Sequence, residues 1–123
     1  MLRRQVGAAL SLQLSGSPYW AQDIGGFFRP DDQYDPEGPY AELLVRWFQF
    51  GAFSPLFRSH GEYPQRETPV IAAQDPAMME SLTYYHRLRY ALMPYIYTVA
   101  ASTHYDDATM MRPLVMDFES DRA

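Results

Sequence analysis

Two short apolar segments constrain the fold most, because each has a polar residue, Asp23 or His60, near its end and a glycine within two residues of it. Residues 18–24 read PYWAQDI and continue into GGFF, and residues 52–57 read AFSPLF and continue into RSHG. Both segments are too short for a helix and are bounded by turn residues, so we interpret them as buried strands. The glycines that follow end each strand in a tight turn.

Helices are predicted on either side of these segments. Residues 2–14 carry one apolar stripe that stops at Ser15-Gly16. A second helix begins at Pro39, which suits the first helical position, and ends at Gly51. Its apolar residues recur at the spacing of one helix face: Tyr40, Leu43, Leu44, Trp47 and Phe48.

A third helix is predicted to begin at Asp75-Pro76, where an acid caps the first turn. Pro94 is expected to break or kink this helix, because proline lacks an N–H and clashes with the preceding turn. A further helical piece is expected from Pro94 to about Tyr105. Residues 29–38 and 62–74 are polar and are predicted to be loops.

The order of elements predicts the fold class. Helices alternate with the two strands, and the closing sequence TMMRPLVMDF resembles one more strand that opens a new element. Strands that alternate with helices are typical of βα units on a parallel sheet, so the sequence predicts an α/β fold.

Composition narrows the function classes. The chain of 123 residues has a net charge of −5, which argues against nucleic acid or an anionic membrane as a partner. It has no cysteine, so disulfides and thiolate metal sites are excluded. No metal site or cofactor is predicted, because His86 and His104 lack helical ligand spacing. Aromatic residues make up 15% of the chain, enough to supply a stacking site.

Asp23 and His60 are the polar residues at the two predicted strand ends. In parallel sheets, ligands bind beyond the carboxyl ends of the strands, which all face one side. A carboxylate there can accept hydrogen bonds from two vicinal sugar hydroxyls, and an imidazole can donate to a hydroxyl. The alternatives are that Asp23 caps the next turn and that His60 is a structural, hydrogen-bonded histidine.

Several other side chains have both a functional and a structural interpretation. Trp20 and Phe27 could stack on a sugar ring, as could Tyr19 and Phe28, although aromatics at strand ends more often belong to the core. Phe27 is the better candidate because it directly follows the glycine turn. The arginines of the third helix, which include Arg89, are interpreted as surface or ion-pair residues.

Four stretches of the sequence closely resemble glycoside hydrolase family 31, which includes α-glucosidases and α-xylosidases. They are SGSPYWAQDIGGFF, LLVRWFQFGAFSPLFRSHG, LRYALMPYIYTVA and MMRPLVMDF, in that order. The resemblance runs from about Leu2 to the C-terminus. It implies a partial (β/α)8 TIM barrel made of the last two βα units over residues 1–107. Residues 108–123 would then be the first strand of a following β-sandwich domain.

The resemblance also implies roles for individual residues. Asp23 matches an aspartate that binds sugar hydroxyls, and His60 matches a histidine with the same role. Phe27 matches an aromatic that lines the −1 subsite. Arg58 belongs to the motif of His60 and is expected to orient or line the site. Trp20 is kept as a further substrate-binding candidate.

The catalytic residues implied by the resemblance are not in this sequence. Family members are retaining enzymes that use two aspartates, one in a W-x-D-M-N-E-like motif and one in a G-D-x motif, and neither motif occurs here. Retention needs two carboxyl groups about 5–5.5 Å apart. Asp23 cannot fill both roles, so no catalytic residue is assigned, and the chain alone is expected to be inactive.

The expected function is therefore that of a hydrolase fragment that binds an α-linked oligosaccharide or glycoside. The sequence resembles α-xylosidases more than starch-acting members, which favours terminal α-xylosidic over α-glucosidic bonds. Two alternatives stay open. The chain could be a non-catalytic carbohydrate-binding module, or it could complete a split barrel together with a missing N-terminal part. The sequence does not indicate a cellular location.

Overall fold

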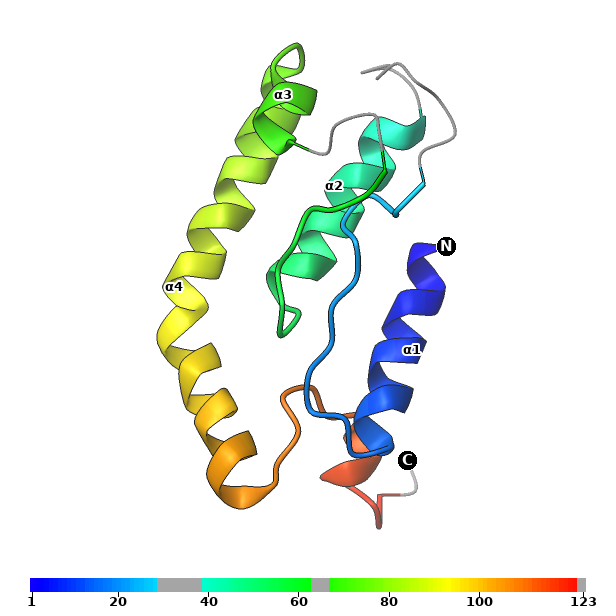
Figure 1. Cartoon of the computed structure of the whole chain (residues 1–123), viewed down its shortest axis with the longest axis vertical. Coiled ribbons are helices and arrows are strands. Elements are labelled where there is room, and N and C mark those ends of the chain that lie inside the picture. The colour runs from blue at the N-terminus through cyan, green and yellow to red at the C-terminus, as the bar shows by residue number, and fades with distance from the viewer. Residues whose placement is uncertain (29–38, 63–66, 122–123) are drawn as a thin grey trace. The chain divides into compact units, whose positions relative to one another are not determined.

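The computed structural model describes residues 1–28, 39–62 and 67–121, and these residues are mainly helical (Figure 1). The elements are α1 (Leu2–Leu14), α2 (Pro39–Ala52), α3 (Thr68–Ala72), α4 (Pro76–Asp106) and the 3₁₀ helix η1 (Leu114–Met116). None of these helices has the length and apolar character needed to cross a membrane. The chain forms two compact units, one of residues 1–20 with 93–123 and one of residues 21–92.

The predicted α/β class, with a partial TIM barrel and the start of a β-sandwich, is wrong for this structure. The described residues form helices and no sheet, and their strand-like pairing is a single isolated parallel bridge between Ile24 and Ser59. A β-strand persists when its backbone groups pair along its length with a neighbouring strand. Here the pairing is limited to that bridge, and residues 53–56 turn instead of extending, so neither apolar segment is a strand.

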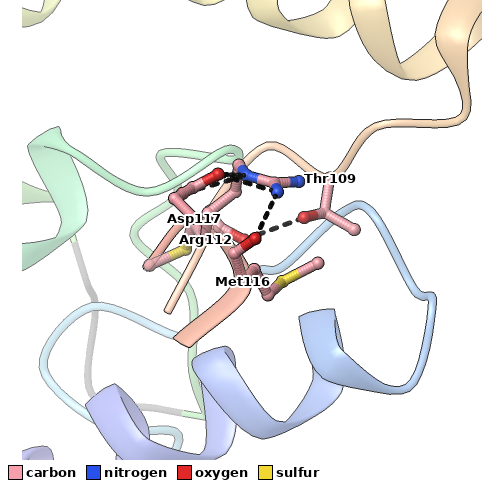
Figure 2. A network of polar contacts seen from close by, with 5 residues as sticks. Thr109, Arg112, Met116 and Asp117 are labelled. Atoms are coloured by element: carbon pink, nitrogen blue, oxygen red, sulfur yellow. Dashed lines mark hydrogen bonds and ion pairs between the residues drawn. The ribbon is translucent and has the colours of Figure 1, made fainter. Parts of the chain in front are cut away.

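The strand predicted for the tail is also wrong. Residues 114–116 form η1, and local polar contacts hold the chain around it (Figure 2). Arg112 Nε donates to the two carboxylate oxygens of Asp117 at 2.9 and 3.2 Å, and Thr109 Oγ1 donates to Met111 O at 3.2 Å. These bonds join residues that are close in the sequence, so they favour a turned rather than an extended tail. The domain boundary between residues 107 and 108 stays a prediction.

The helix predictions agree with the structure in most respects. α1 and α2 begin where the sequence places them, and Asp75 caps α4 by accepting a hydrogen bond from Met78 N at 3.0 Å. The expected break at Pro94 is wrong, because α4 continues through it to Asp106. One proline removes one backbone hydrogen bond, and α4, which has 31 residues, tolerates that loss.

The predicted loops fall partly outside the described residues. The whole of loop 29–38 and residues 63–66 of loop 62–74 lie there. Within the second loop the structure forms the short helix α3, so that part of the prediction is wrong. Pro69 lies in the first turn of α3, where a missing N–H costs nothing.

The unit of residues 21–92 is built around the apolar face of α2. Leu44, Trp47 and Phe48 are at most 2% exposed, and Leu82 from α4 and Ile24 are equally buried. Gly51 makes the contact with Ile24 possible, because a Cβ at position 51 would lie 2.7 Å from Ile24 Cδ1. This packing fixes the backbone next to Asp23 against the end of α2.

The other unit joins α1 to the tail. Gln13 is fully buried, and its Oε1 accepts a hydrogen bond from Met111 N at 3.2 Å. Pro18 O accepts a second bond from Met110 N at 3.4 Å. Trp20, one of the predicted site residues, ends the first stretch of this unit.

Candidate functional site

Asp23 and Arg58 form an ion pair in the unit of residues 21–92. Arg58 Nη2 lies 2.6 Å from Asp23 Oδ1, and Ile24 N donates to Arg58 O at 3.1 Å. The Asp23 side chain is 21% exposed and the Arg58 side chain 55%. A carboxylate has two oxygens that each accept hydrogen bonds, so Asp23 can serve a ligand hydroxyl while it holds Arg58.

The two glycines that follow Asp23 are needed for the turn. Gly25 and Gly26 have φ values of 90° and 81°, a region that side-chain-bearing residues rarely adopt. A Cβ on Gly25 would also lie 2.7 Å from the hydroxyl oxygen of Tyr40. That hydroxyl donates to Gly25 O at 3.1 Å. The double glycine therefore lets the chain reverse directly after the carboxylate, close to α2.

Phe27 and His60 meet beside this turn. Their ring centroids are 5.7 Å apart at a tilt of 59°, and Phe27 O accepts a hydrogen bond from Glu62 N at 3.0 Å. Phe28 packs edge-on against Phe27 at 4.9 Å. Phe27 is 41% exposed and His60 is also exposed, so the two rings present an aromatic surface to solvent.

The structure thus brings together four of the five predicted site residues. Asp23 and Phe27 come from one segment, Arg58 and His60 come from the other, and the Ile24–Ser59 bridge joins the two segments. Trp20 belongs to the other unit. Across the described parts of the chain, no three histidine or acidic side chains group closely enough to hold a metal ion.

The interpretation of Arg89 as a surface or ion-pair residue is wrong. Arg89 is 9% exposed, and its guanidinium donates to the backbone oxygens of Ala52, Ser54 and Pro55. Burial lowers the pKa of Arg89 from its usual value because it disfavours the charged form. Arg89 follows Leu82 by seven residues, so its position on the apolar stripe of the helix was the available signal.

The site combines a carboxylate, a guanidinium, an imidazole and an exposed aromatic ring, a set that suits a polyhydroxylated ligand. The class of protein follows from comparison with known families. Residues 1–99 match the family model described as "Glycosyl hydrolases family 31 TIM-barrel domain". The chain belongs to glycosyl hydrolase family 31.

Similar curated proteins include both xylosidases and glucosidases. The chain is 43% identical over 121 residues to an α-xylosidase of Saccharolobus solfataricus, which covers 98% of the chain and 16% of that protein. It is 34% identical over 123 residues to a probable glucan 1,3-α-glucosidase of Oryza sativa subsp. japonica, with 98% of the chain and 12% of the relative covered.

Two crystal structures are also similar. The family 31 α-xylosidase of Xanthomonas citri matches with a TM-score of 0.85 and 46% identity, over 97% of this chain and 13% of that one. A family 31 α-xylosidase from a soil metagenome, complexed with xylose, matches with a TM-score of 0.76 and 34% identity, over 98% and 20% of the two chains. The chain therefore spans a fifth or less of each relative named here.

Proposed function

We propose that this chain is the part of a retaining α-glycosidase that binds the sugar in the −1 subsite, with terminal α-xylosidic bonds as the preferred substrate. One observation carries the proposal. A backbone bridge joins the two segments that form both the Asp23–Arg58 ion pair and the Phe27–His60 ring pair. The substrate is an α-linked oligosaccharide or glycoside. Family membership supports the reaction class.

Each side chain has a defined role in this proposal. The Asp23 carboxylate accepts hydrogen bonds from vicinal sugar hydroxyls, and Arg58 holds that carboxylate in place through Oδ1. His60 donates to a further hydroxyl, and the exposed ring of Phe27 covers an apolar face of the sugar. Trp20 belongs to the other unit, so its role in binding stays a prediction from the sequence. Hydroxyl contacts that strengthen in the transition state contribute to the rate of glycoside hydrolysis.

The two catalytic aspartates are proposed to come from the rest of the enzyme. Neither of the family motifs that carry them occurs in these 123 residues. Asp23 is paired with Arg58, which suits a carboxylate held in one orientation as a hydrogen-bond acceptor for the sugar. The chain thus binds the sugar, and carboxyl groups elsewhere attack and protonate the glycosidic bond.

Similarity supports the preference for xylosides. The 43% identity to an α-xylosidase exceeds the 34% identity to a glucan 1,3-α-glucosidase, and both of the crystal structures described above are α-xylosidases. A xyloside lacks the hydroxymethyl group of a glucoside. The groups that sense this difference must lie near the 5-position of the bound sugar.

The test uses the full-length protein encoded by the reading frame that contains this chain. We expect it to hydrolyse an aryl α-xyloside with a higher kcat/KM than an aryl α-glucoside. Faster hydrolysis of the glucoside would refute the preference, and no hydrolysis of either would refute the proposal. Xylose binding by the 123-residue chain, with no hydrolysis by the full-length protein, would instead indicate a binding module.

A matched pair of variants tests the site itself. Asp23→Asn keeps the size of the side chain but removes its charge, and we expect kcat/KM to fall about 10- to 100-fold, because a hydrogen bond to a charged group is worth about 1.5–3 kcal/mol. Glu80→Gln makes the same kind of change at an exposed position on α4 and should leave kcat/KM unchanged. Equal activity of the two variants would remove Asp23 from the site.

A further inference from the structure

Arg89 makes an unusual set of contacts for a buried cation. Nη1 donates to Ala52 O at 3.1 Å and also to Ser54 O, and Nη2 donates to Pro55 O at 2.8 Å. Its guanidinium carbon lies 5.7 Å from the ring centroid of Phe57. All of these partners belong to residues 52–57, which we call the 52–57 turn. Arg89 therefore binds one short stretch of backbone at three points.

The 52–57 turn leads directly into the candidate site. It begins at the last residue of α2, and Arg58 and His60 follow it within three residues. The carbonyl of Ala52 lies at the C-terminus of α2, where the helix dipole favours a positive charge. Arg89 thus binds one carbonyl at the end of the helix and two carbonyls just beyond it, on the path by which the backbone reaches Arg58.

A second contact links the same turn to the other segment of the site. Gln22 Nε2 donates to Ser54 Oγ at 3.0 Å, and that hydroxyl donates to Phe50 O at 3.2 Å. Ser54 is fully buried and Gln22 is 5% exposed. Because Gln22 directly precedes Asp23, the 52–57 turn is connected by polar contacts to both segments that carry the site residues.

We propose that Arg89 is a positioning residue of the sugar site, which fixes the 52–57 turn so that Arg58 and His60 lie beside Asp23 and Phe27. The inference rests on the proposed function for its effect on catalysis. Arginine suits this task because its planar guanidinium offers five donors in a fixed geometry. Lysine offers one compact ammonium group, which cannot reproduce the same three-point contact.

Arg89→Met tests the inference in the full-length protein. We expect kcat/KM on the aryl α-xyloside to fall about 10- to 100-fold, because a displacement of about 1 Å in a binding group costs up to about 100-fold. Arg89→Lys should recover part of this loss. Arg87→Met is the matched control, since Arg87 is an exposed arginine on the same helix, and it should keep the wild-type value.

Hydrogen–deuterium exchange separates positioning from general stabilisation. The amides of Ile24 and Glu62 are hydrogen-bonded to Arg58 O and Phe27 O, so peptides that cover residues 21–28 and 53–62 report how the two segments are joined. We expect Arg89→Met to speed exchange in these peptides while peptides from the middle of α2 keep their protection. Unchanged exchange in the two segments, or equally faster exchange throughout α2, would overturn the inference.

The exchange measurement needs no turnover, so the two proposals can fail separately. A wild-type protein that is inactive on both glycosides overturns the proposed function. Altered exchange in the Arg89→Met variant with a normal kcat/KM overturns the positioning role, because the segments would then move without consequence for the sugar. Should Arg89→Met fail to fold, Arg89→Lys provides the same exchange and kinetic readouts.

Discussion

Asp23 and Arg58 are unequally exposed, and this limits what their ion pair can contribute to stability. The Arg58 side chain is 55% exposed, and an exposed ion pair is worth about 0.2–1 kcal/mol even at the short distance of 2.6 Å found here. The ion pair therefore matters more for the orientation of the Asp23 carboxylate than for the free energy of unfolding. Arg58 holds one carboxylate oxygen of Asp23 and so limits the orientations of the other.

Replacing Arg58 should affect activity much more than stability. In Arg58→Ala we expect the free energy of unfolding to fall by less than about 1 kcal/mol, because water takes the place of the lost guanidinium. We expect kcat/KM on the aryl α-xyloside to fall at least about 10-fold, because Asp23 loses its fixed orientation. Urea unfolding and steady-state kinetics on one preparation provide both values. A large loss of stability with normal kinetics would contradict this view of the pair.

At the scale of single residues, the sequence indicated the two segments of the site but not the contacts between them. Asp23 and His60 each have a glycine within two residues near the end of an apolar segment, and that pattern predicted that they face the same side. Their roles as sugar ligands stay predictions. The support from Arg89 was missed because the residue type suggested the surface, whereas its partners are backbone oxygens far away in the sequence.

At the scale of elements, the long helices were predictable, whereas the strands and the short helices α3 and η1 were not. α1, α2 and the start of α4 follow from apolar periodicity and from an Asp-Pro cap, which are local properties of the sequence. A strand depends on a partner elsewhere, and the only pairing in the described residues is the Ile24–Ser59 bridge. Short apolar segments therefore predicted burial correctly for Ile24 but predicted the wrong element.

The end of α2 provides a test of packing at this scale. A Cβ at Gly51 would lie 2.7 Å from Ile24 Cδ1 and 3.3 Å from a ring carbon of Phe57. Gly51→Ala should therefore lower the free energy of unfolding by about 1–3 kcal/mol, the usual cost of overpacking a core. Ile24→Val removes the nearest atom and should reduce that cost when it is combined with Gly51→Ala.

Gly7 is the matched control for this test, because it also lies within a helix but has nothing within 4 Å of its would-be Cβ. Gly7→Ala should raise the free energy of unfolding by about 0.5–1 kcal/mol, since alanine suits a helix interior better than glycine. Chemical denaturation of both variants in the full-length protein, which is expected to unfold cooperatively, measures the difference. Equal effects of the two substitutions would show that Ile24 does not pack tightly on α2.

At the scale of the whole chain, many large apolar side chains are in contact with solvent. The most exposed include Tyr90, Tyr97, Tyr105, Leu114 and Phe28, all more than 70% exposed. Single exposed apolar residues are ordinary, but this many on 123 residues leave the chain with much apolar surface uncovered.

The purified 123-residue chain is therefore expected to be aggregation-prone or to lack fixed tertiary packing. Exposed apolar surface favours association over a unique fold, while local hydrogen bonding preserves the helices. Far-ultraviolet circular dichroism should show helix, heating should give no cooperative transition, and a hydrophobic dye should bind. The full-length protein is the control and should melt cooperatively. A soluble monomer of the 123-residue chain with a sharp melting transition would show that its two units supply a sufficient core on their own.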